Sequence, residues 1–147
     1  MNSSVPRRAE LRLESFDRAM RQLTIAVERV SPSDDDDISL QEEGLIQRFE
    51  YCFELAWKLL KDIADESTGM DDLRVAGPRA AIMWAQTSGW VRNGELWLSM
   101  LRSRNVTTHV YDRVTIQPIL NLIRGLYFTA LNELRERARN YLAPDAS

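Results

Sequence analysis

The sequence predicts an all-α protein, an up-and-down bundle of four or five helices. Three long stretches carry apolar residues in alternating steps of three and four, which is the period of one buried helix face. Glycine and proline number only 6 and 5 among 147 residues, too few for a loop-rich all-β fold. A chain of this length has room for one domain, which we place at 10–142. A disordered N-terminal tail, 1–9, and a C-terminal tail, 143–147, flank it.

The first helix is expected from about Glu10 to Val30. One face of it carries the apolar residues Leu13, Phe16, Met20, Leu23, Val27 and Val30. The acidic run Asp34 to Asp37 follows in the connection. Its spacing matches no calcium-binding loop, so we interpret it as a solvated loop rather than a cation site.

Ser39 and Glu42 fit a capping box that begins a second helix. The buried stripe of this helix comprises Ile46, Phe49, Phe53, Ala56, Leu60 and Ile63. Cys52 lies beside that stripe and is expected to be a small packing residue. Glu54 and Lys58, one turn apart, should pair on a solvated face. Residues 65–72 are expected to end the helix.

A short third helix is expected to begin at Gly77-Pro78 and to end at Gly89, since proline suits a first helical turn and glycine a helix end. Asn93 should cap a fourth helix that runs from Gly94 to about Asn105. Its buried stripe is formed by Leu96, Trp97, Met100 and Leu101.

The last helix begins at Asp112 or at Thr115. We favour Thr115 as its cap, because Pro118 then falls in the first turn, where proline is tolerated. The apolar seam of this helix is Ile116, Leu120, Ile123, Tyr127, Ala130 and Leu134. Four tryptophans in so small a chain offer more large apolar surface than one bundle core absorbs, so we expect a homodimer.

The composition excludes several classes of function. A net charge of −3 argues against a broad electrostatic grip on nucleic acid, so we expect no DNA partner, and any RNA contact should be local or built by oligomerisation. No stretch resembles a signal peptide or reaches membrane-spanning length, and the single Cys52 suits a reducing compartment. We therefore expect a cytoplasmic protein with no membrane partner. One histidine cannot complete a di-metal carboxylate site, and nucleotide- and zinc-binding motifs are absent, so we expect no metal and no cofactor.

The segment from Arg104 to Tyr111 carries the candidate chemistry. It contains the only histidine, His109, and the stripe of the fourth helix places Arg104 on the inward side, where a charge needs a partner or a purpose. A histidine can exchange a proton with a ribose hydroxyl or a leaving oxygen, while a guanidinium can fork onto the phosphate. This pair indicates RNA cleavage without a metal. Alternatively both residues are structural: His109 caps the fourth helix, and Arg104 pairs with a core carboxylate such as Glu50.

Several short motifs occur in a recognisable order. They are Gln47-Arg48-Phe49-Glu50, Glu54-Leu55-Ala56-Trp57-Lys58, Pro78-Arg79, Trp97, Arg104-Asn105 and Thr108-His109-Val110-Tyr111. In this order they resemble the nucleotidyltransferase substrate-binding protein family, which belongs to the HEPN superfamily of helical bundles, over about residues 10–140. The resemblance implies a four- or five-helix bundle, a homodimer, and a partner that is a minimal nucleotidyltransferase (MNT), usually encoded by an adjacent gene.

HEPN proteins often act as metal-independent endoribonucleases through an Arg-x4–6-His motif. Arg104 and His109 match that motif, and Asn105 matches the polar residue after the arginine. In paired modules the HEPN member can be the toxin, which the nucleotidyltransferase neutralises by adding adenylate to a tyrosine that Tyr111 matches. Relatives often have an acidic residue where this chain has Ser103; such an acid could orient the arginine.

The resemblance leaves more than one function open. Some members of this branch are described only as substrate-binding subunits. The protein is therefore expected to be a ribonuclease toxin of a toxin–antitoxin-like module or, alternatively, a non-catalytic subunit that docks a minimal nucleotidyltransferase. A third interpretation is a purely structural dimerisation bundle with a satisfied histidine.

Overall fold

The structure is a computed structural model that describes residues 7–68 and 76–143. Its helical elements are α1 (Arg8–Arg29), α2 (Leu40–Thr68), α3 (Pro78–Thr87), α4 (Gly94–Thr107), α5 (Arg113–Leu122), the π-helical segment η2 (Ile123–Tyr127) and α6 (Phe128–Leu142). The described residues contain no β-strand, only an isolated bridge between Asp37 and Asp112. The predicted all-α class is confirmed.

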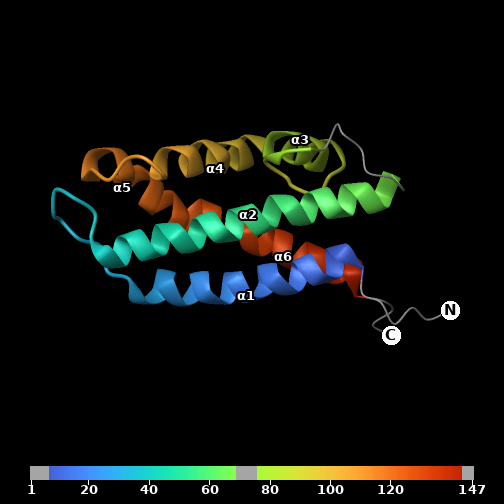
Figure 1. Ribbon diagram of the computed structural model, residues 1–147, viewed down its shortest axis with the longest axis horizontal. Helices are drawn as coiled ribbons and strands as arrows, with labels where there is room; N and C mark the ends of the chain where they lie inside the picture. The colour runs from blue at the N-terminus through green and yellow to red at the C-terminus, as the bar shows by residue number, and fades with distance from the viewer. Residues whose placement is uncertain (1–6, 69–75, 144–147) are drawn as a thin grey trace.

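The helices pack as the predicted up-and-down bundle (Figure 1). α1 and α2 lie side by side in opposite directions, α6 packs against both, and α3 and α4 lie along another side of α2. The α1–α2 loop and the α4–α5 junction lie at one end of the bundle. The start of α1 and the end of α6 lie at the other, where the Arg7 guanidinium is 6.0 Å from the Tyr141 ring centroid. In the part of the chain that the structure describes, no helix is long and apolar enough to cross a membrane.

The three predicted seams form the core. Every predicted seam position of α2 and of the last helical stretch is buried, whereas Leu13, Val27 and Val30 at the ends of the α1 seam are only partly buried. Within this core the Phe49 ring stacks on the Tyr127 ring, with ring centroids 5.3 Å apart. Burial of each such large apolar side chain stabilises the fold by roughly 1.5–3 kcal/mol, so this layer holds the helices together.

Local capping signals predicted several helix ends correctly. The Asn93 side chain accepts a hydrogen bond from the Leu96 amide at 3.1 Å and caps α4. Pro78 occupies the first position of α3, and Gly89 follows that helix with a φ of 80°, a conformation that glycine adopts without strain. Each of these signals acts over a few residues, so tertiary packing does not alter it.

Two other ends differ from the prediction. α1 begins at Arg8 rather than Glu10, because the Arg7 amide donates to the Glu10 carboxylate at 2.9 Å and the helix starts there. Ala9, assigned to a disordered tail, is thus helical and fully buried; residues 1–6 of that tail lie outside the described residues. α2 continues through Thr68, and the rest of its expected end, 69–72, likewise lies outside them.

α4 also runs further than predicted, to Thr107 instead of Asn105. The residues after Asn105 are β-branched, and β-branched residues have a weak preference for helix. The Thr107 hydroxyl, however, donates to the Glu50 carboxylate at 2.6 Å and lies 3.2 Å from the Arg104 carbonyl. These contacts satisfy the hydroxyl within the helix, which offsets the weak helical preference of threonine.

The last helical stretch begins at Arg113 with Asp112 as its cap, so the preferred cap, Thr115, was wrong and the alternative was right. The Asp112 carboxylate accepts a hydrogen bond from the Thr115 amide at 2.9 Å. Pro118 consequently lies inside α5 rather than in its first turn. Further on, the wider π-helical turns of η2 separate α5 from α6, where one continuous helix was expected. Ile123 and Tyr127, which begin and end η2, both remain buried.

The buried Tyr127 hydroxyl provides a direct test of this packing. It lies 2.6 Å from the Ser99 hydroxyl and 2.8 Å from that of Ser103. Tyr127→Phe should lower the free energy of unfolding by about 1–2 kcal/mol, because both serines lose a partner in a dry site. Urea denaturation measures this loss. Tyr51→Phe, at an exposed ring, is the control and should change nothing; equal stability of both variants would contradict the prediction.

Candidate functional site

The predicted site lies at the C-terminal end of α4 and in the α4–α5 connection, residues 108–112. Arg104 belongs to the last turn of α4. The chain leaves that helix through a hydrogen bond from the His109 amide to the Val106 carbonyl at 3.0 Å. Tyr111 precedes the cap of α5. The sequence-predicted residues therefore occupy one short stretch at one end of the bundle.

Arg104 is held on the side of α4 that faces α2, as predicted. Its Nη1 donates to Glu54 Oε1 at 2.8 Å, and its Nε donates to Asn105 Oδ1 at 3.2 Å. The guanidinium carbon lies 5.8 Å from the centroid of the Phe53 ring. With 26% of the side chain exposed, the cation is fixed in direction yet still open to solvent.

Arg104 pairs with Glu54, which neither the catalytic nor the structural interpretation of the sequence named as its partner. The structural alternative paired it with Glu50, but that carboxylate accepts the Thr107 hydroxyl instead. Glu54 was assigned to a solvated face, where it does pair with Lys58 at 3.3 Å, but it also contacts Arg104 across the α2–α4 interface. The α2 face is thus part of the site.

His109, Asn105 and Tyr111 have exposed side chains. Among the described residues, the His109 imidazole makes no hydrogen bond, so it does not cap α4 as the structural alternative required. The structure joins Arg104 to Asn105 but brings neither His109 nor Tyr111 into hydrogen-bond contact with the guanidinium. The arrangement is one oriented cation in the last turn of α4, followed along the chain by an exposed imidazole and an exposed phenol.

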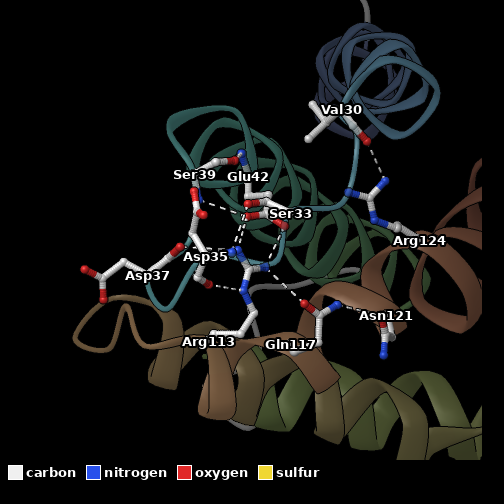
Figure 2. A network of polar contacts seen from close by, with 10 residues as sticks. All are labelled: Val30, Ser33, Asp35, Asp37, Ser39, Glu42, Arg113, Gln117, Asn121 and Arg124. Atoms are coloured by element: carbon white, nitrogen blue, oxygen red, sulfur yellow. Dashed lines mark hydrogen bonds and ion pairs between the residues drawn. The ribbon is translucent and has the colours of Figure 1, made fainter.

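Arg113 is the residue that the sequence analysis missed (Figure 2). Its Nη1 and Nη2 contact the two carboxylate oxygens of Glu42 at 2.8 and 2.9 Å, and its Nε donates to the Asp35 carbonyl at 2.8 Å. Glu42 also completes the predicted capping box with Ser39, at 2.9 and 3.0 Å. The sequence indicated the capping role of Glu42 but not its ion pair with Arg113.

Main-chain hydrogen bonds complete the attachment. The Arg113 amide donates to the Asp36 carbonyl at 2.8 Å, and the Ile38 amide donates to the Tyr111 carbonyl at 3.2 Å. The acidic loop, Asp34–Asp37, therefore uses its carbonyls to hold the start of α5 while its four side chains are exposed. The α4–α5 connection is fastened at its C-terminal end to the loop that precedes α2.

Electrostatics at this attachment are strong. The hydrogen bonds from Arg113 lower the pKa of Glu42 from 4.5 to about 2, against the opposing effect of burial.

Cys52 is a packing residue as predicted rather than a nucleophile. It is fully buried, and burial raises the pKa of its thiol to about 12. The described residues contain no group of three or more His, Cys, Asp or Glu side chains suited to a metal ion.

Comparison with known proteins assigns the chain to a family. Residues 11–140 match the family described as nucleotidyltransferase substrate binding protein like. The chain belongs to this family. One relative is the protein named "Probable ribonuclease HepT" from Haemophilus influenzae. It is 26% identical over 98 residues, which cover 64% of this chain and 67% of that protein.

Two solved structures share the fold. One, from Thermus thermophilus, has a TM-score of 0.72 and 27% identity, and covers 84% of this chain and 98% of that one. The other is a Haemophilus influenzae protein described as revealing the fold of a substrate binding domain of a nucleotidyltransferase. It has a TM-score of 0.73 and 23% identity, with 86% of this chain and 98% of that one covered. The family's helical bundle is therefore the fold of this chain.

The Glu42–Arg113 pair makes the stability of the fold dependent on pH. Because the pKa of Glu42 is lowered from 4.5 to about 2, its contribution is complete above pH 4.5 and disappears as the pH falls towards 2. This loss of folding free energy amounts to about 3 kcal/mol. Urea denaturation between these pH values should show the stability difference between wild type and Glu42→Gln shrinking as the pH falls. A constant difference would show that the pair does not titrate as stated.

Proposed function

We propose that this protein is the ribonuclease subunit of a two-component module with a minimal nucleotidyltransferase. Arg104 and His109 would form its catalytic pair, and adenylylation of Tyr111 would silence it. The observation that supports this most is an arginine oriented by Glu54 and Asn105 and followed, five residues along the chain, by an exposed histidine whose side chain makes no hydrogen bond within the described residues. The relative named a probable ribonuclease supports the same reaction.

The chemistry requires only the RNA and these side chains. His109 accepts the proton of a ribose 2′-hydroxyl, and the 2′-oxygen attacks the adjacent phosphorus. The bond from phosphorus to the 5′-oxygen breaks, leaving a 2′,3′-cyclic phosphate and a 5′-hydroxyl. Arg104 binds the phosphate oxygens, whose charge grows in the transition state. In a homodimer the second His109 would donate a proton of its own to the leaving 5′-oxygen, while the first keeps the proton taken from the 2′-hydroxyl.

Tyr111 is suited to be the control point. Its side chain is 55% exposed, and its carbonyl is tied to the Ile38 amide, so the phenol stands in solvent on a fastened segment. The nucleotidyltransferase would direct the phenol oxygen onto the α-phosphorus of ATP, with pyrophosphate leaving. The added phosphate would lie two residues from His109 and close to the acidic loop. Like charges would then repel the RNA backbone.

Removal of the imidazole tests the catalytic proposal. His109→Ala should cut mixed cellular RNA at least about 100-fold more slowly than wild type in excess EDTA, because a general acid–base group is lost. Intact mass should first show that the wild-type protein carries no adenylate. Arg102→Ala, at an exposed arginine of the same helix, is the matched control and should cleave normally. Equal cleavage by wild type and His109→Ala would refute the proposal.

Arg104→Ala is a second variant that tests the catalytic pair, and it should still fold. Glu54 keeps its contact with Lys58 at 3.3 Å, so the cost in stability should stay below about 1 kcal/mol. Loss of cleavage by this variant with an unchanged urea transition would separate catalysis from folding.

A second function, a non-catalytic subunit that docks the nucleotidyltransferase, is favoured by a different observation. Three large side chains within three residues of the Asp37–Asp112 bridge are strongly exposed: Leu40 at 79%, Val114 at 85% and Tyr111 at 55%. The acidic loop adjoins them. Exposed apolar groups beside charged ones are typical of a protein-binding surface, and a partner with an apolar, basic-rimmed surface would fit.

Co-elution with the nucleotidyltransferase encoded beside this chain tests the docking function. Wild type should form a stable complex at micromolar concentration, and Leu40→Asp with Val114→Asp should weaken it at least about tenfold, by burying unpaired charge. Leu126→Asp, at a leucine of η2 that is 60% exposed, is the control. Failure of the two wild-type proteins to associate would exclude this function. A stable complex with no RNA cleavage in either state would favour it over the ribonuclease.

A further inference from the structure

A cationic groove lies between α1 and α2, on the side of α2 away from the Phe49–Tyr127 core layer. It has a volume of about 440 Å³. Among the residues that line it are Arg18 and Gln22 from α1 and Gly44, Gln47, Arg48 and Tyr51 from α2. None of its lining residues is acidic. We call it the α1–α2 groove.

The two arginines of this groove are uncompensated. Within the described part of the chain, neither Arg18 nor Arg48 forms an ion pair, whereas Arg12, Arg104 and Arg113 each pair with a carboxylate within 3.0 Å. In a chain with a net charge of −3, two arginines in one groove whose lining contains no acidic residue form a local anion-binding surface. This is the kind of local contact that an acidic protein needs in order to bind RNA.

The groove also offers a stacking surface and a path to the candidate site. The Tyr51 side chain at its edge is 59% exposed. Arg48, Tyr51 and Glu54 follow one another at intervals of three residues, over roughly 9 Å of helix at 1.5 Å per residue. Glu54 in turn contacts Arg104. Along α2, Tyr51 and Glu54 therefore lie between Arg48 of the groove and the Arg104 guanidinium.

We propose that the α1–α2 groove binds the backbone of single-stranded RNA whose neighbouring phosphate is cleaved at Arg104 and His109. The proposal rests on the ribonuclease function. Arg18 and Arg48 contact phosphates, and the Tyr51 ring stacks on a base. A single strand fits better than a duplex, because stacking requires a base with a free face. A path continuing from groove to catalytic pair favours a polymer over free phosphate.

Gly44 permits a sharp test. A Cβ added there meets no atom within 4 Å, so a longer side chain can be accommodated. Gly44→Glu would place a carboxylate in the groove, and Gly44→Gln is the neutral control of the same shape. The second variant, Arg18→Gln with Arg48→Gln, removes both cations. Arg102→Gln, outside the groove, is its control.

Binding is measured by fluorescence anisotropy of a labelled oligouridine, in the His109→Ala background so that the RNA stays intact. Gly44→Glu and the double arginine variant should each weaken binding at least about tenfold at low salt. The double variant should also flatten the dependence of log affinity on log salt by about 0.7 per lost phosphate contact. Gly44→Gln and Arg102→Gln should bind as the parent does.

Three results would overturn the proposal: no binding by the parent, equal binding by all variants, or displacement of the RNA by inorganic phosphate as effectively as by unlabelled oligouridine. Cleavage kinetics separate it from the ribonuclease proposal itself. With His109 intact, the double variant should raise KM about tenfold and leave kcat unchanged, since it removes binding remote from the reacting phosphate. Cleavage with an unchanged KM would retain the ribonuclease and reject the groove as its RNA-binding surface.

Discussion

The ion pair between Glu42 and Arg113 is the contact on which the candidate site depends. Glu42 is buried at the start of α2, and Arg113 lies at the start of α5, 71 residues later. A buried carboxylate is costly unless its charge and its oxygens are satisfied. Here a bidentate guanidinium and the Ser39 amide satisfy both oxygens, while two loop carbonyls and the Gln117 side chain accept further hydrogen bonds from Arg113. One pair therefore caps a helix, orders the acidic loop and fixes the segment that carries Tyr111.

The second interface that shapes the site is between α2 and α4. Arg104 shares Glu54 with Lys58, so in a single chain its charge is partly neutralised and any phosphate must compete with a carboxylate. Asn105 and the Phe53 ring keep the guanidinium oriented during that exchange. The Ser103 side chain turns inward to the Tyr127 hydroxyl and makes no hydrogen bond to Arg104 within the described residues. Glu54 orients Arg104 from another helix.

The distribution of charge over the surface indicates more about possible ligands than the net charge of −3 does. The exposed carboxylates of the acidic loop lie at the end of the bundle, beside Tyr111, whereas unpaired arginines line the α1–α2 groove. These surfaces would attract different ligands: a basic protein at the end of the bundle and an anionic backbone along α2. In the proposed function, the RNA and the controlling protein would therefore approach the segment from Arg104 to Tyr111 over different surfaces.

The sequence by itself determined the helical class, the three seams, the caps at Ser39 and Asn93, Pro78 at the first position of α3, and the family motif from Arg104 to Tyr111. These features depend on periodicity or on contacts within four residues, which are set before helices pack. The tertiary structure alone decided that Arg104 pairs with Glu54, 50 residues away, and that Arg113 pairs with Glu42. It also decided the start of α5 at Asp112, which the Asp36 and Tyr111 backbone pairings stabilise against the start at Thr115. Such pairings follow from the angle and register at which helices meet, and no local pattern in one sequence encodes them.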